Sequence, residues 1–182
     1  MFCGRLPHWR SISIHPSIAM SHGKILISIF SGTQKGQNKI AIPTAELLPD
    51  HGLIGDHHAG LKPHRQVSLF ASEIFLQIVA AGVALSPEEL STNLLTEGLE
   101  LDALTAGTRL KIGATIIEIT EARKPCGALT KIDKRLPKAT YRQCGQFARV
   151  IEGGMILSGD KIEILSEHKT NFDKSLEGIG KD

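Results

Sequence analysis

A chain of 182 residues with 41% hydrophobic and 22% charged residues has the size and composition of one globular domain. A net charge of +2 is too small to indicate a nucleic-acid or membrane-surface partner, and no apolar run reaches the length of a transmembrane helix. Three cysteines are too few and odd in number for a disulfide framework. They indicate a reducing compartment, so we expect a cytoplasmic protein.

The beginning of the chain differs in composition from the rest. Residues 1–45 contain no Asp or Glu, and Arg5 and Arg10 stand among Ser and Ile in the opening stretch. That composition resembles an organelle transit peptide, although two prolines interrupt any amphipathic helix there. We expect residues 1–22 to form a flexible leader, with organelle targeting as the alternative, and residues 166–182 to form a loose C-terminal tail.

Short β-branched, apolar runs that end at Gly or Pro predict about eight strands. The clearest cover residues 24–30, 39–42, 66–70, 109–112, 115–120, 147–151, 155–157 and 161–165. Gly113-Ala114 is a hairpin signal between two of these strands, and Glu152-Gly153-Gly154 joins the strands 147–151 and 155–157.

Helices are expected in three places. Ser72 begins an amphipathic stretch that ends before Gly82, Pro87 begins a short acidic turn, and residues 128–136 form a short helix. The segment 49–64 holds three Gly, two Pro and four His, and is expected to be irregular. Strands at such short intervals do not fit repeated βαβ units, so we predict an α+β, mainly β fold dominated by a closed or nearly closed β-barrel.

Cys126 is the first candidate for chemistry. It lies between Pro125 and Gly127 and directly after Arg123 and Lys124. Adjacent cations and a following helix would lower the pKa of the thiol and favour the thiolate, which is a nucleophile and a soft metal ligand. A buried structural cysteine beside two solvated cations explains the pattern equally well.

Cys144 has a weaker claim. It is 18 positions after Cys126, so the two cysteines do not form a CxxC pair for zinc. We expect Cys144 to be a small packed thiol.

Four histidines, at positions 51, 57, 58 and 64, lie in the irregular segment. Asp56 directly precedes two of them and could fix the tautomer of an imidazole. A zinc site is disfavoured because all four fall in one loop rather than on rigid elements. His57 or His58 is better suited to hydrogen bonding or acid–base work, and a loop held together by Asp–His bonds is the structural alternative.

Two arginines next to or on predicted strands need an anionic partner. Arg65 precedes the strand 66–70, and Arg149 lies within the strand 147–151. An Arg that points into a barrel pairs with an anionic ligand or with a protein carboxylate, and the sequence leaves both alternatives open.

Seven blocks, in the same order as in the family, resemble the MOSC domain, the C-terminal domain of molybdenum-cofactor sulfurases, in its stand-alone bacterial type. The blocks are GLIGDHHAG (52–60), RQVSLF (65–70), NLLTEGLEL (93–101), GTRLKIG (107–113), ARKPCGAL (122–129), CGQFARVIEGG (144–154) and GDKIEIL (159–165). The resemblance covers residues 23–165. It implies a pyruvate-kinase-like β-barrel with a few peripheral helices.

The resemblance also implies a cofactor. The Cys of the KPC block, Cys126 here, is the proposed sulfur carrier or molybdenum ligand in such proteins, and some relatives reduce N-hydroxylated compounds on bound molybdenum cofactor. The family label of pyridoxal phosphate binding is not expected to apply, because no Schiff-base lysine context is visible. One departure is Ser91-Thr92, which stands where the family usually shows Gly-Glu.

Molybdopterin carries a phosphate and a metal-bound dithiolene, so it requires cations, polar groups and a soft ligand. The residues expected to bind the cofactor are Arg65, Asn93, Arg123, Lys124 and Arg149. Cys126 is the expected metal ligand. The expected catalytic residues are Cys126, His57 and Asp56, of which His57 and Asp56 would act in proton delivery.

Three functions remain open at this point. The first is a molybdenum-cofactor enzyme that reduces N-hydroxylated small molecules, such as N-hydroxylated purines, with electrons from a partner reductase. The second is a carrier of sulfur or cofactor that uses Cys126 as a persulfide or metal site and delivers to a receiving enzyme. The third is a barrel with an inactive site, which the Ser91-Thr92 departure would explain.

Overall fold

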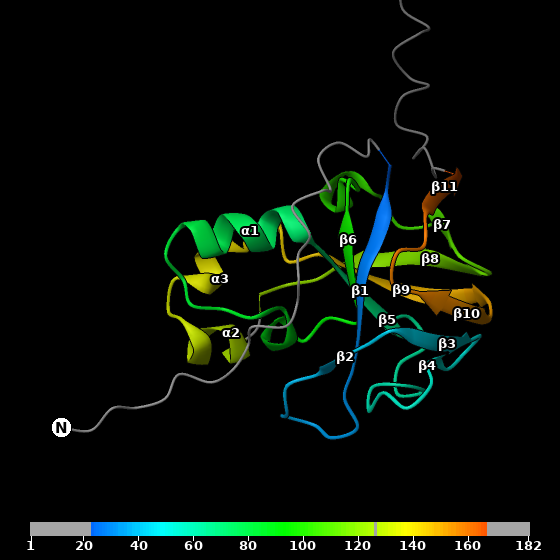
Figure 1. The fold of residues 1–182 in the computed structure, drawn as a ribbon, viewed down its shortest axis with the longest axis horizontal. Helices are drawn as coiled ribbons and strands as arrows, with labels where there is room; N and C mark the ends of the chain where they lie inside the picture. The colour runs from blue at the N-terminus through cyan, green and yellow to red at the C-terminus, as the bar shows by residue number, and fades with distance from the viewer. Residues whose placement is uncertain (1–22, 126, 167–182) are drawn as a thin grey trace, which may run out of the picture.

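The computed structural model describes residues 23–125 and 127–166, so the predicted leader, Cys126 and all but the first residue of the predicted tail lie outside the described residues. In the described part of the chain there are eleven strands (Figure 1). They are β1 (Ile25–Ser31), β2 (Ile40–Ile42), β3 (Thr44–Leu48), β4 (Gly52–Leu53), β5 (Val67–Ala71), β6 (Leu94–Glu97), β7 (Arg109–Ile112), β8 (Thr115–Ala122), β9 (Gln146–Glu152), β10 (Gly154–Leu157) and β11 (Ile162–Ser166).

Eight strands form one curled sheet in the order β11-β7-β8-β9-β5-β6-β1-β2. All neighbours in this sheet are antiparallel except β5 and β6, which are parallel. A parallel pair needs a crossover, and here the connection carries the helix α1 (Ser72–Ala80) and the 3-10 turn η1 (Pro87–Leu90). The hairpin predicted at Gly113-Ala114 joins β7 to β8.

The curled sheet almost closes on itself. A single bridge pairs Ile25 with Lys161, Leu26 N donates to Asp160 O at 2.8 Å, and Ile162 N donates to Lys24 O at 2.7 Å. No continuous ladder joins β1 to β11 among the described residues. The predicted α+β, mainly β fold with a barrel is therefore confirmed, as a barrel that closes incompletely.

A second sheet, β10-β3-β4, packs beside the barrel. Along β3 every other residue is buried, which is the period of a half-buried strand. Ala45, Leu47 and Ile156 from this sheet join the barrel core. The small sheet therefore extends the barrel wall rather than forming a separate domain.

Apolar side chains on both faces bury the middle of the large sheet. One cluster, which includes Leu26, Leu69 and Leu94, fills the barrel. The residue that follows each of these leucines in the sequence points to the other face of the sheet and packs in a second cluster. The second cluster contains Phe30, Phe70, Ile78, Val83, Leu90, Leu95, Leu129, Leu136 and Cys144. It lies under α1, α2 (Gly127–Ile132) and α3 (Leu136–Ala139), which Figure 1 shows together on one side of the barrel. The burial of Cys144 agrees with its expected role as a packed thiol.

The helix predictions hold with small changes of boundary. The helix α1 starts at Ser72, but Ala71 is its N-cap, and Gly82 with φ +79° follows its C-terminus. The turn at Pro87 is a 3-10 helix with a capping box between Ser86 and Glu89. The helix expected over 128–136 is interrupted and forms α2 and α3. None of the described helices is long and apolar enough to cross a membrane.

The sequence analysis predicted about eight strands and missed β3, β4 and β6. Strand β3 has the sequence TAELL, in which only Thr strongly favours a strand, and it becomes one because it pairs with β10. Strand β4 lies inside the segment that was expected to be irregular, and it pairs with β3. Pairing with a partner strand, rather than local propensity, therefore determines that these segments form strands.

Candidate functional site

Asp56 is the centre of a buried polar network. It follows β4 in a turn in which Asp56 N donates to Leu53 O at 3.1 Å, and its side chain is 2% exposed. Its Oδ2 accepts hydrogen bonds from Lys39 Nζ at 2.6 Å, from Asn93 Nδ2 at 3.1 Å and from Gly32 N at 3.2 Å. Its Oδ1 accepts from the backbone N of His58 at 3.0 Å.

These contacts keep the Asp56 carboxyl ionised. Burial alone would raise the pKa of Asp56, but the hydrogen bonds from His58 and Lys39 and the charge of Lys39 outweigh it and hold the pKa well below its usual range. The carboxylate therefore has its charge and its lone pairs committed to protein donors. It can orient its neighbours, but it has little capacity left for a ligand.

Lys39 is a residue of this network that the sequence analysis missed. It precedes β2, and its side chain is 1% exposed. A lysine is almost never fully buried unless it is paired, and here the Asp56 carboxylate is the partner. Burial lowers the pKa of Lys39, Asp56 opposes this, and the positive charge of Arg123 lowers it further. No local pattern in the Lys39 region of the sequence indicates this role.

Asn93 connects the network to the sheet at the start of β6. Its side-chain oxygen accepts from Ser68 Oγ at 2.8 Å and Ser68 N at 3.2 Å, and its Nδ2 donates to Phe30 O at 3.2 Å as well as to Asp56. Because Asn93 is 3% exposed, these bonds are shielded from water. Asn93 therefore positions Asp56 rather than presenting its amide to a bound molecule.

Both adjacent histidines are oriented by the same network. His57 Nδ1 lies 3.0 Å from Gly32 O, and His58 Nδ1 lies 3.2 Å from Asp56 Oδ1. A carbonyl and a carboxylate only accept, so Nδ1 of each ring carries the proton. The His58 side chain is 48% exposed, and His57 is half-buried. The prediction that Asp56 fixes the tautomer of a neighbouring imidazole is supported for His58.

Arg123 links this network to the KPC block. It follows β8, and its Nη2 donates to the carbonyl of Leu90 at 3.3 Å, just before the turn that leads to Asn93. Its guanidinium carbon lies 5.5 Å from the centre of the Phe147 ring, and that of Arg65 lies 5.1 Å from the same ring. The structure therefore brings Asp56, Asn93, Arg123 and Arg65 together through short chains of contacts.

Arg65 and Arg149 are both paired with carboxylates on β8. Arg65 forms a two-bond ion pair with Glu121, whose pKa is lowered chiefly by this contact. Arg149 donates through Nη2 to Glu118 at 2.8 Å, and Arg109 donates to the other oxygen of Glu118. The structure thus supports the ion-pair alternative for both arginines. Sequence reasoning missed Glu118 as a partner.

Lys124 is exposed, and its charge contributes to the lowered pKa of Glu121. Cys126, the expected metal ligand and catalytic thiol, lies outside the described residues. On its two sides, Pro125 is half-buried and α2 begins at Gly127, so the expected helix follows the KPC block. The roles of Lys124 and Cys126 remain predictions.

The Ser91-Thr92 departure is accommodated by the backbone. Ser91 has φ +54°, a left-handed conformation that favours the glycine usually found in the family. Thr92 is buried, and its hydroxyl donates to Ser68 O at 3.0 Å. Thr92 thus braces the same β5–β6 junction as Asn93.

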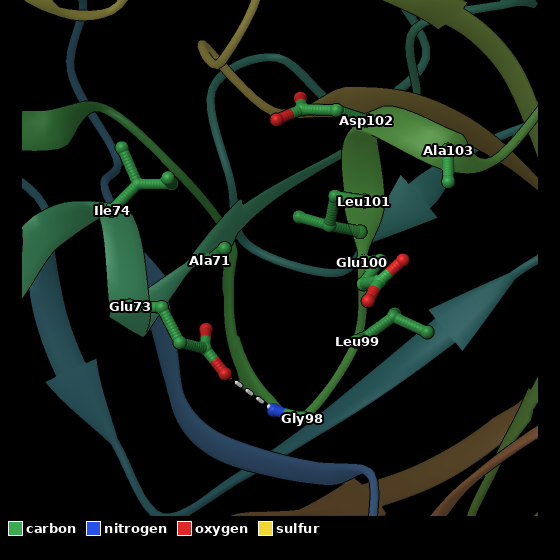
Figure 2. A pocket seen from close by; sticks show the side chains of 9 residues that line it. All are labelled: Ala71, Glu73, Ile74, Gly98, Leu99, Glu100, Leu101, Asp102 and Ala103. Atoms are coloured by element: carbon green, nitrogen blue, oxygen red, sulfur yellow. Dashed lines mark hydrogen bonds between the residues drawn. The ribbon is translucent and has the colours of Figure 1, made fainter.

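An acidic cleft of about 520 Å³ lies at the other end of β5 and β6 (Figure 2). The carboxylates of Glu73, Glu100 and Asp102 surround apolar side chains, and Glu73 accepts a hydrogen bond from Gly98 N at 2.6 Å. Burial raises the pKa of Asp102. Ser68 and Asn93 lie at the start of these strands and the cleft at their end, so the cleft is separate from the Asp56 network.

The fold and the network together define a class: a mainly β, incompletely closed barrel with a buried Lys–Asp–Asn network beside a KPC block. The sequence profile of the MOSC domain matches residues 55–163, which is more than half of the chain. This chain belongs to the MOSC domain family.

Solved structures support the fold. The YuaD protein of Bacillus subtilis is 18% identical, with a TM-score of 0.69 over 76% of this chain and 93% of that one. YiiM of Geobacillus stearothermophilus is 18% identical, with a TM-score of 0.63 over 79% and 75% of the two chains. YiiM of Escherichia coli is 19% identical, with a TM-score of 0.63 over 81% and 72%. No curated protein matches the chain.

Proposed function

We propose that this MOSC protein binds molybdenum cofactor beside the KPC block and reduces N-hydroxylated small molecules, N-hydroxylated purines among them. The observation that carries the proposal is the convergence of the Asp56 network, the turn 90–93 and Arg123, which stands three residues before Cys126 in the sequence. Four segments far apart in sequence are brought together there, and three of them contain residues of the blocks that carry the MOSC resemblance: Asp56, Asn93 and Arg123. The scarcity of cysteines supports a cytoplasmic location.

The residues present fit an anionic, flat cofactor. Arg123 and Lys124 supply positive charge shortly before residue 126 in the sequence, and the Arg123 guanidinium is supported by the Phe147 ring, 5.5 Å from its centre. Lys39 does not contribute to anion binding, since Asp56 neutralises it. The Arg65 and Arg149 charges are balanced by Glu121 and Glu118, so we assign the phosphate contact to Arg123 and Lys124.

The cofactor, when bound, supplies a redox-active metal that Cys126 would ligate. Reduction of an N–OH group to N–H consumes two electrons and two protons and releases water, so a partner reductase must supply the electrons. His58 is suited to deliver a proton through Nε2, because the Asp56 carboxylate holds its Nδ1 and leaves Nε2 for the transferred proton. Asp56 itself acts as a positioning residue.

Elemental analysis and turnover test the proposal together. Gently purified protein should contain molybdenum and should reduce an N-hydroxylated purine with reduced viologen as electron donor. Cys126→Ser and Arg123→Gln should lose metal and turnover, whereas Arg149→Gln should keep both, because the half-exposed Arg149 side chain is already paired with Glu118.

The same assay separates the alternatives. Molybdenum without turnover would favour the carrier function, in which Cys126 holds sulfur or cofactor for a receiving enzyme. Protein that takes up no molybdenum even when it is supplied with cofactor would contradict the proposal and favour an inactive barrel.

A further inference from the structure

The segment around and after the KPC block is strongly basic. Residues 123–143 contain seven Lys or Arg and one acid, Asp133, although the whole chain has a net charge of only +2. The rest of the chain is therefore net negative, and positive charge is concentrated in the segment that forms α2, α3 and the turns beside them (Figure 1). A concentration of one sign of charge steers the approach of an oppositely charged partner.

The single acid of this segment neutralises one cation and leaves the others. Asp133 accepts from Arg135 Nη2 at 2.8 Å, and the hydrogen bonds from Arg135 lower the pKa of Asp133 to about 2. Arg135 also donates to Gly82 O, after the end of α1, at 3.0 Å. This ion pair therefore ties α3 to α1 and has a structural role.

Four further cations and one aromatic ring lie on the outside of the helical layer, and we call them the basic face. They are all exposed and comprise Lys131, Lys134, Lys138, Tyr141 and Arg142. Within the described part of the chain, none of these four cations forms an ion pair. The Tyr141 ring is 66% exposed, and the Arg142 guanidinium carbon lies 5.8 Å from its centre. Tyr and Arg are the side chains that frequently anchor protein interfaces.

The packing of α3 directs this face outward. Leu136 and Thr140, four positions apart, are fully buried and define the inner side of the helix. Lys138 lies midway between them, about 200° around the helix from each, so it lies on the outer side. The face is also close to the expected cofactor site. Helix α2 begins at Gly127, next to Cys126 in the sequence, and Lys131 follows after about 6 Å along the helix axis.

We propose that the basic face is the docking surface for an acidic electron-carrier protein that bears a flavin or an iron–sulfur cluster. This inference rests on the proposed function, which needs an electron donor. Each N–OH group reduced to N–H takes up two electrons and two protons and releases water, and the carrier is oxidised by the same two electrons. A carrier bound over α2 and α3 is placed beside the segment that contains Cys126.

The size and charge of the face fit a transient protein partner better than a nucleic acid. Electron-transfer complexes are small and weak and bury less than about 1,200 Å² in total, which suits two short helices. A nucleic acid would extend beyond the face and meet the rest of the chain, which is net negative. An acidic carrier of globular shape needs to meet only the cations themselves.

The test compares the wild type with two triple variants of equal net charge. The first carries Lys134→Glu, Lys138→Glu and Arg142→Glu. The control carries Lys35→Glu, Lys111→Glu and Lys161→Glu, which replace exposed lysines outside the face. Because all six side chains are exposed, both variants should fold, and their melting temperatures verify this. Binding of oxidised flavodoxin, an acidic flavin carrier, is titrated by fluorescence anisotropy.

We expect the face variant to bind flavodoxin at least about tenfold more weakly than the wild type and the control. Wild-type binding should also weaken as the ionic strength rises from about 0.01 M to about 0.1 M, because the Debye length falls from about 30 Å to about 10 Å. Equal binding by the two variants, or no wild-type binding at the lower ionic strength, overturns the docking surface. Tighter binding of single-stranded DNA than of flavodoxin overturns it in favour of a nucleic-acid partner.

Turnover separates this inference from the proposed function. Reduced viologen is a small cation that needs no basic docking surface, so the face variant should keep viologen-driven turnover within about twofold and lose flavodoxin-driven turnover about tenfold. Equal loss with both donors would show that the face does not act in docking. A wild type without viologen-driven turnover would contradict the proposed function, whereas the binding titrations contain no molybdenum and still decide whether the face binds the carrier.

Discussion

The five donors around Asp56 make its ion pair with Lys39 sensitive to the loss of either partner. Both side chains are at most 2% exposed, so a remaining single charge would be buried without compensation. The pair of Arg149 with Glu118 provides a contrast, because the Arg149 side chain is half exposed and Glu118 keeps Arg109 as a second partner when Arg149 is replaced.

Lys39→Met and Asp56→Asn should each lower the free energy of unfolding by about 3–5 kcal/mol. The double variant should lose less than the sum, because neither substitution then leaves a buried charge alone. Urea unfolding at neutral pH measures all three, with Arg149→Met as a control expected to cost at most about 1 kcal/mol. Strict additivity of the two single losses would show that the two charges do not depend on each other.

The lowered pKa of Asp56 predicts a loss of stability in acid. Burial acts in the opposite direction, but hydrogen bonds from His58 and Lys39 prevail, so the folded protein releases this proton more readily than the unfolded chain. The stabilisation is complete above the unfolded pKa of about 3.9 and is lost as the pH falls below it. Between pH 5 and pH 3, urea midpoints of the wild type should therefore fall more steeply than those of Asp56→Asn. Parallel curves would contradict the assignment.

At the scale of elements, the helical layer depends on a few fully buried side chains. Leu136 opens α3 and has no exposed surface, whereas Leu76 on α1 is 59% exposed. Both are leucines on helices, which makes them a matched pair.

Leu136→Ala should cost about 2–5 kcal/mol of unfolding free energy, because it leaves a cavity against the sheet. Leu76→Ala should change the stability by less than about 0.5 kcal/mol. Thermal or urea unfolding of the two variants decides the point. Similar small losses for both would mean that the helices contribute little to the stability of the barrel.

The elements differ in how much of them the sequence reveals. Runs such as 115–120 predict strands because β-branched and apolar residues alternate, and the structure places β8 there. Strand β3 was missed because Ala and Glu carry no such signal, and its pairing with β10 joins residues more than a hundred positions apart. Asp56 and the histidines stood out as a motif, but Lys39 and Glu118 did not, because each gains its role only from a partner brought close by folding.

At the scale of the whole molecule, the barrel has a weakly joined seam in the described part of the chain, where β1 approaches the segment before β11. One bridge, Ile25 to Lys161, and a few backbone hydrogen bonds around it hold this seam. Strands β8 and β9, by contrast, pair over six positions. The barrel should therefore open first at the seam, because fewer hydrogen bonds must break there.

Amide hydrogen exchange in the native protein tests this expectation. Leu26 N and Ile162 N donate across the seam, and both residues are at most 4% exposed, so solvent exposure of the folded state does not explain a fast rate. We expect these amides to exchange at least tenfold faster than the hydrogen-bonded amides of the β8–β9 ladder, which corresponds to an opening free energy lower by about 1.4 kcal/mol or more. Equal protection on both sides would show that the barrel opens as one cooperative unit despite its incomplete closure.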